Sequence, residues 1–189
     1  MASQKMVVHA PNQSPAFCEE VTMFEMPLHP AVVHVPVALA ILMPFLTLGL
    51  LVAWWRDWLP GRAWAIAVAL QAVLVVGAVT AVQTGEAEEE RVEEVVDHDL
   101  IEEHEEGAKL VVWSSGGALI VMLLPLFLPG ERRKKLAAVA ASGATVAVMV
   151  LALGVGKAGG ELVYEHGAAD AHGDDVPSDA QGHEEDDDD

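Results

Sequence analysis

Four long runs without Asp, Glu, Lys or Arg decide what this chain can fold into. They cover residues 31–55, 63–82, 110–128 and 136–156. Each holds the roughly 20 residues that a helix needs to cross the hydrocarbon core of a bilayer. Backbone groups in lipid must be hydrogen-bonded inside the segment, and these runs lack the alternating pattern of a barrel strand. The sequence therefore predicts an all-α integral membrane protein, an up-down bundle of four transmembrane helices.

The remaining sequence divides the chain into a membrane domain and two tails. Residues 28–165 are the predicted four-helix transmembrane domain. Residues 1–27 carry no apolar signal-peptide core and are predicted to be loosely ordered, so the first span acts as the insertion signal. Residues 166–189 combine Asp, Glu, Gly and His and are predicted to be a disordered acidic tail. The helices are expected over about 30–55, 62–84, 88–128 and 135–157.

Prolines and glycines mark the expected irregularities of these helices. Pro36 and Pro44 should bend the first helix, because each removes a backbone donor. Thr84-Gly85 should end the second helix as a C-terminal cap. The charged segment 86–107 has no proline and no internal glycine, so it should extend the third helix beyond the membrane. The glycines between 154 and 160 should break up the fourth helix.

The distribution of charge predicts the orientation and the class of partner. The net charge is −19, yet the short first and third connections carry Arg56, Arg62 and the basic run 132–135. Basic loops stay in the cytoplasm, so both termini and the acidic second connection should be periplasmic, in a multi-pass protein of the bacterial inner membrane. An acidic exterior argues against nucleic acid. It would suit a basic periplasmic electron carrier.

Several kinds of chemistry are excluded by what the chain lacks. Cys18 is the only cysteine, which rules out an internal disulfide, a cysteine-based zinc site and a covalently attached c-type haem. No Ser/His/Asp arrangement and no phosphate-binding glycine loop is present, and we assign no catalytic residue. An electron-transfer or accessory subunit is therefore favoured over a stand-alone enzyme.

The histidines carry the strongest functional signal, because all eight fall on the same predicted side of the membrane. His34 and His104 lie on otherwise apolar helical faces at similar depth, since the first and third helices run in the same direction. An ionisable side chain within a span indicates a functional site. Two neutral imidazoles from facing helices are what bis-histidine haem b ligation requires. The alternative for each is an imidazole bound to a backbone carbonyl or to water.

Three further histidines are candidate ligands. His29 opens the first helix beside Pro30 and could support a ligand or replace one. His98 shares a helical face with Glu94 and Glu102, so it could bind a divalent cation, although a solvated charged surface explains the same pattern. His166 follows the fourth helix and could approach the same cluster.

Short motifs resemble a known family. The run Leu-His-Pro-Ala-Val-Val-His-Val-Pro at 28–36 resembles the opening His-Pro-x-x-Val-His-Phe-Pro of a bacterial membrane family called domain of unknown function 2231. Thr84-Gly85, a histidine before the third helix (His98 or His104) and Gly160-Glu-Leu-Val-Tyr are similar to it as well. The match covers about residues 28–165, with Val35 in place of the usual Phe. The resemblance implies a four-helix membrane domain whose members can accompany cytochrome and Rieske-type modules.

These observations predict a membrane electron-transfer subunit resembling a b-type cytochrome. Haem b would be bound between the first and third helices, near the periplasmic face, by His34 and His104. Electrons would pass between a periplasmic carrier or respiratory-complex subunits and the membrane, with quinone as a candidate partner. One alternative is a copper-, zinc- or iron-binding membrane protein that uses His29, His34, His98, His104 and His166 with nearby carboxylates. Another is an accessory subunit of a larger membrane complex, without a cofactor.

Overall fold

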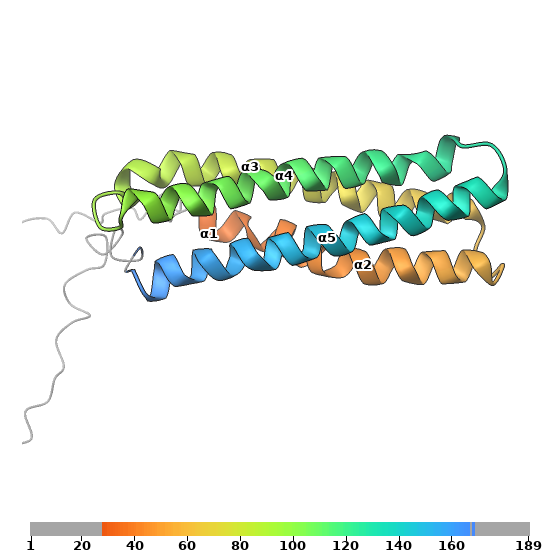
Figure 1. The fold of residues 1–189 in the computed structure, drawn as a ribbon, viewed down its shortest axis with the longest axis horizontal. Coiled ribbons are helices and arrows are strands. Elements are labelled where there is room, and N and C mark those ends of the chain that lie inside the picture. Colours follow the sequence, from red (N-terminus) through yellow and green to blue (C-terminus); the bar gives the residue numbers. More distant parts are fainter. Residues whose placement is uncertain (1–27, 167, 169–189) are drawn as a thin grey trace, which may run out of the picture.

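Four long antiparallel helices form the described part of the protein (Figure 1). The computed structural model describes residues 28–166 and 168, apart from the side chains of residues 28, 90 and 91. The predicted loose segment 1–27, and the acidic tail except for residues 166 and 168, lie outside it. The elements are α1 (Leu28–Val32), α2 (His34–Trp55), a 3₁₀ turn η1 (Gly61–Ala63), α3 (Trp64–Val92), α4 (His98–Phe127) and α5 (Glu131–Tyr164).

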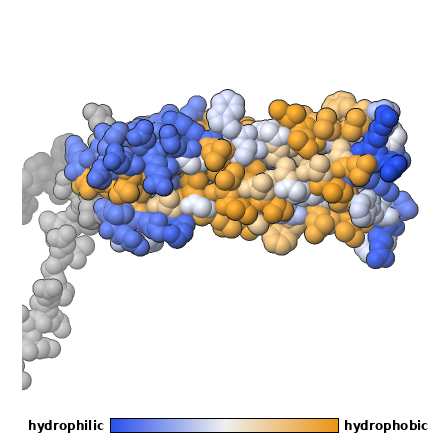
Figure 2. All heavy atoms as spheres, in the orientation of Figure 1, coloured by the Kyte–Doolittle hydropathy of each residue, from blue (hydrophilic) through white to orange (hydrophobic). Residues whose placement is uncertain are grey.

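The helices have the length and surface of a membrane bundle. Four of them are long and apolar enough to cross a bilayer, which confirms the predicted fold class. Phe45, Val76 and Ile120 each expose 66% of their surface, as expected for side chains that contact lipid. Figure 2 shows this apolar band between hydrophilic ends. We call the end with α1 and the α3–α4 connection the acidic end, and the other the basic end.

The charged part of the acidic end projects beyond the apolar band. α3, α4 and α5 contain 29, 30 and 34 residues, so at 1.5 Å per residue they measure roughly 44–51 Å. The hydrocarbon core of a bilayer is only about 30 Å thick. The charged residues that end α3 and begin α4 are therefore outside the apolar spans.

The first span is interrupted at Val33, which separates α1 from α2. Pro36 has no amide proton to donate to the Val32 carbonyl, so one helical hydrogen bond is missing there. On either side the helical pattern holds, since the Val33 amide donates to the His29 carbonyl and the Val37 amide to the Val33 carbonyl, both at 3.1 Å. Pro44 lies inside α2 without ending it.

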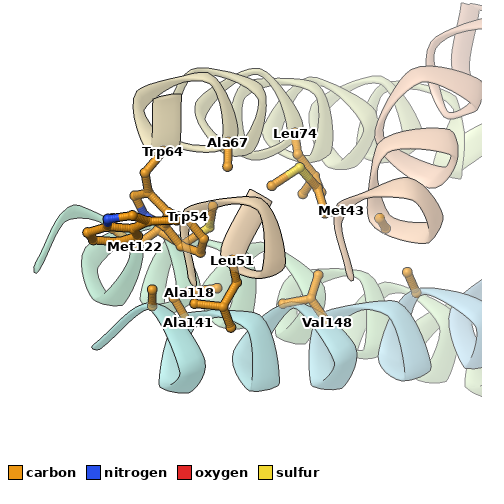
Figure 3. Packing of buried hydrophobic residues seen from close by; sticks show 13 residues of the cluster. Met43, Leu51, Trp54, Trp64, Ala67, Leu74, Ala118, Met122, Ala141 and Val148 are labelled. Atoms are coloured by element: carbon orange, nitrogen blue, oxygen red, sulfur yellow. The ribbon is translucent and has the colours of Figure 1, made fainter. Parts of the chain in front are cut away.

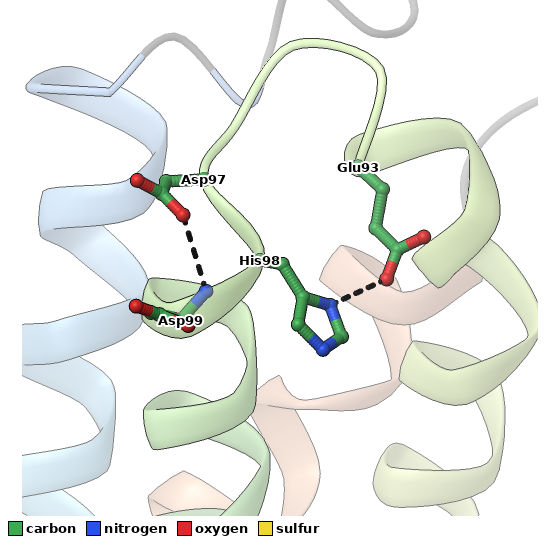
Figure 4. Close-up of polar contacts among 4 residues, drawn as sticks. All are labelled: Glu93, Asp97, His98 and Asp99. Carbon is green, nitrogen blue, oxygen red and sulfur yellow. Dashed lines mark hydrogen bonds and ion pairs between the residues drawn. The ribbon is translucent and has the colours of Figure 1, made fainter.

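Three predicted helix ends are wrong, and contacts between helices explain two of them. α3 continues through Thr84-Gly85 to Val92, and Gly85 faces the His29 ring from α1. α5 continues through its glycines to Tyr164, and Gly159 makes room for a ring from α4. α4 begins only at His98, where the Asp97 side chain accepts a hydrogen bond from the Asp99 amide at 3.3 Å (Figure 4).

The apolar core occupies the middle of the bundle and its basic end (Figure 3). Trp64 is its largest fully buried side chain, at 1% exposure. The indole Nε1 of Trp64 donates to the Met122 carbonyl at 2.9 Å, which joins α3 to α4. Nearby, a Cβ atom at position 61 would lie 2.7 Å from the Trp54 ring, so the turn between α2 and α3 requires Gly61.

A polar layer crosses the core, with one buried residue from each long helix: Thr47, Gln71, Ser115 and Thr145. The Gln71 Nε2 donates to the Ser115 carbonyl at 3.0 Å. The Thr47 and Thr145 hydroxyls lie 3.3 Å apart. Interhelical hydrogen bonds of this kind help to fix the register of helices in a bilayer, where lipid is as apolar as the core.

Candidate functional site

A cavity of about 360 Å³ lies within the bundle toward the acidic end. All five α-helices contribute to its walls, which consist mainly of Pro, Val, Leu, Ala and Gly. The polar exceptions among the described residues are His29, His34, His104 and Tyr164. The volume and the few convergent polar groups are typical of a small-molecule binding site. We call it the histidine cavity.

His29 is oriented by contacts with α3. Its Nδ1 lies 2.9 Å from the Ala81 carbonyl and 3.4 Å from the Thr84 hydroxyl, and its backbone amide donates to Glu88 Oε1 at 3.2 Å. A carbonyl can only accept, so Nδ1 carries the proton when the ring is neutral. Nε2 then has a free lone pair, as in the histidine ligands of many metal sites.

Residues 28–36 pack on a face of α3 that is made of small residues. A Cβ atom at position 85 would lie 3.2 Å from both Cε1 and Nδ1 of His29, and one at position 77 would lie 3.3 Å from Pro36 Cδ. Ala81, between these glycines, supplies the carbonyl that His29 binds. The Thr84-Gly85 pair therefore positions a histidine instead of ending a helix.

His104 reaches the same cavity from α4. A Cβ atom at position 159 would lie 2.9 Å from its Cε1, so the ring packs directly on the backbone of α5. Its Nδ1 is buried and has no hydrogen-bond partner among the described residues. His29 is close enough for the two rings to repel each other if both were protonated. The ring also interacts with the Val155 backbone of α5, and it lines the cavity.

His34, the first residue of α2, lines the cavity from an exposed position. The structure thus brings both of the predicted haem ligands, His34 and His104, to the walls of one cavity. It adds His29, which the sequence identified as a supporting or replacement group for the haem ligands and as a candidate metal ligand. His166 is exposed and lines neither this cavity nor the one beside it.

A second cavity of about 420 Å³ adjoins the first, and His29 and His104 line both. This acidic cavity is lined by four carboxylates: Glu86, Glu88, Glu89 and Glu105. Lys109 Nζ lies 2.7 Å from Glu105 Oε1 and 3.7 Å from Glu86 Oε1. His29 and His104 therefore lie between the apolar histidine cavity and the acidic cavity.

His98 belongs to a different cluster, outside the apolar spans. Its Nδ1 lies 2.7 Å from Glu93 Oε1, across the α3–α4 connection (Figure 4). The hydrogen bond with Glu93 and the charge of that carboxylate raise the pKa of His98. The ligand atoms of Glu89, Glu93 and His98 all lie within 4.8 Å of one another. The predicted grouping of His98 with Glu94 and Glu102 assumed one continuous helix, whereas α4 begins at His98.

Gly159→Ala should displace the His104 ring, because the new methyl group would lie 2.9 Å from Cε1. We expect His104 to react several-fold faster with diethyl pyrocarbonate, measured by mass spectrometry of the modified peptide. Gly160→Ala is the matched control, since nothing lies within 4 Å of a Cβ atom there. Equal His104 reactivity in both variants would contradict the contact.

Comparison with known proteins identifies the family. No curated protein and no solved structure matches the chain. The model of the family described as "Predicted membrane protein (DUF2231)" matches residues 25–172. This range holds every described helix and all three histidines of the cavity. The chain therefore belongs to the DUF2231 family of membrane proteins.

Proposed function

We propose that the protein is an electron-transfer subunit that binds haem b in the histidine cavity, near a periplasmic acidic end in the bacterial inner membrane. One observation carries the proposal. Imidazoles from three separate segments, His29 of α1, His34 of α2 and His104 of α4, line one apolar space. Basic loops at the opposite end of the bundle support the orientation.

The residues present fit a haem group. Neutral imidazole is a usual ligand of haem iron. His29 and His104 both line the cavity, and Nε2 of His29 is not used by the Ala81 contact. The histidine cavity and the acidic cavity meet at these two rings. Within the described chain, only Glu89, Glu93 and His98 form a group of three or more residues whose ligand atoms lie within 4.8 Å of one another. The three cavity histidines therefore suit a larger group better than a single bound ion.

The contacts favour His29 as the partner of His104 in holding the iron. The Ala81 carbonyl fixes the tautomer and orientation of His29, whereas His34 is exposed at the edge of the cavity. His34 is the alternative ligand, as the sequence predicts. When bound, haem supplies a one-electron couple. The protein would supply the ligands, their orientation and an apolar wall that excludes water from the iron.

Haemin titration of the purified full chain in detergent tests the proposal. We expect a saturable Soret absorption change with one haemin bound per chain, and the same change in His98→Ala, which lies outside the cavity. Haemin that only partitions into the detergent, with no saturation, would overturn the proposal.

A second candidate function is capture of a divalent cation by Glu89, Glu93 and His98, favoured by their close ligand atoms. We expect Glu93→Gln to weaken Zn²⁺ binding several-fold in equilibrium dialysis. Glu94→Gln, outside the cluster, should leave it unchanged. Because Glu93 raises the pKa of His98, a proton competes with the metal below that pKa, and binding should strengthen as the pH rises through it. Equal affinities in both variants would exclude the site.

A further inference from the structure

We propose that the histidine cavity opens sideways into the bilayer between α2 and α5, and that this opening, beside the space proposed for haem, receives the head group of a lipid-dissolved quinone, with His34 as its hydrogen-bonding residue. The role of the quinone as a redox partner rests on the proposed function. Quinone binding itself requires only the apolar cavity and the imidazole, so it can be measured separately from haem binding.

The opening is marked by residues that line the cavity and are also exposed. On α2 these are His34 and Val37, and on α5 they are Gly156, Val163 and Tyr164. Tyr164 is 89% exposed. Val37 and Gly156 belong to the uncharged runs that form the spans, so this side of the cavity faces lipid. His34 lies near the start of its uncharged run, and Tyr164 ends α5, beyond Lys157 and Glu161. A bilayer places amphipathic side chains toward its surface.

The chemistry of the walls selects the class of ligand. Among the described residues, no Asp, Glu, Lys or Arg lines this cavity, so it offers no counter-charge to a phospholipid phosphate. No hydrogen bond joins the His34 side chain to another residue in the described part of the chain. A neutral imidazole can donate to a quinone carbonyl and accept from a quinol hydroxyl. An apolar ring that carries such oxygens matches both the walls and the imidazole.

Two glycines of α5 keep space open in the cavity. Nothing lies within 4 Å of a Cβ atom at Gly156 or Gly160, and both residues line the cavity. The Cβ atom of a leucine at position 160 would therefore meet no neighbour, and its side chain would occupy space of the cavity. Gly154 has equally free surroundings but does not line the cavity. Gly154→Leu is therefore a matched control on the same helix.

The test is equilibrium binding of decylubiquinone to the full chain in nanodiscs of neutral phospholipid. We expect saturable binding of one quinone per chain. His34→Leu should weaken it about three- to tenfold, the effect of one lost hydrogen bond, and His34→Gln should weaken it less because an amide can still donate. Gly160→Leu should abolish it. Gly154→Leu should bind as the wild type does.

Two results would overturn the quinone site: partitioning without saturation, or unchanged binding in both His34→Leu and Gly160→Leu. The haemin titration separates this failure from that of the proposed function. Saturable quinone binding that Gly160→Leu abolishes supports the site even if haemin fails to bind. Saturable haemin binding combined with non-saturable quinone partitioning rejects the quinone site and leaves the haem proposal standing.

Discussion

His104→Ala will reduce haemin affinity by more than about 100-fold, while His98→Ala will leave it unchanged. His104 is placed by packing on Gly159, and its buried Nδ1 has no partner among the described residues. The ring lines both cavities, so a ligand bound there would contact His104. Groups that merely orient a metal ligand contribute about 10- to 100-fold to affinity. Loss of the ligand itself should therefore lower the haemin affinity by a larger factor.

The same titration distinguishes His29 from His34 as the second ligand. If His29 is the ligand, His29→Ala will leave a five-coordinate, high-spin haem, and His34→Ala will keep the six-coordinate, low-spin spectrum. The reverse result would restore the pair His34 and His104 that the sequence predicts. Unchanged affinity in His104→Ala, with the protein folded, would reject both pairs.

Trp64→Ala will lower the free energy of unfolding by about 3–5 kcal/mol, the range for a large aromatic side chain removed from a core. Trp64 is 1% exposed, and its Nε1 donates to the Met122 carbonyl. In lipid the loss is mainly one of packing, because the bilayer is as apolar as the core. The substitution would leave a void between α3 and α4 at the basic end.

Reversible unfolding of the protein in mixed micelles, followed by circular dichroism, gives this free energy. Trp113→Ala is the matched control, since Trp113 is 79% exposed and its loss should change the free energy by less than about 0.5 kcal/mol. The free energy of unfolding of Trp64→Phe should lie between those of the two alanine variants, because phenylalanine keeps most of the packing and loses the hydrogen bond. Equal effects of Trp64→Ala and Trp113→Ala would contradict the described core.

The four spans could be predicted from the sequence because lipid allows few solutions. A run of about 20 uncharged residues has to be helical in a bilayer, and the fold class is confirmed on that ground. The convergence of His34 and His104 on one cavity also follows from helix direction and periodicity. These properties depend on the length and pattern of single segments.

The contacts between segments could not be read from the same pattern. Thr84-Gly85 has the composition of a helix end, yet it receives the His29 ring. Gly159 would be unfavourable in an isolated helix, but it allows His104 to approach α5. His98 pairs with Glu93 rather than Glu94 or Glu102, because a connection separates α3 from α4. A glycine signals either a break or a close contact, and only the partner helix decides between them.

The reduced-minus-oxidised spectrum of the full chain, purified from bacterial membranes under haem-replete growth, tests most directly whether the histidine cavity holds haem. We expect Soret and α bands of a b-type cytochrome, with a haem content approaching one per chain in the wild type and His98→Ala, and neither band in His104→Ala. A featureless spectrum from folded wild-type protein, or bands that persist unchanged in His104→Ala, would contradict this assignment.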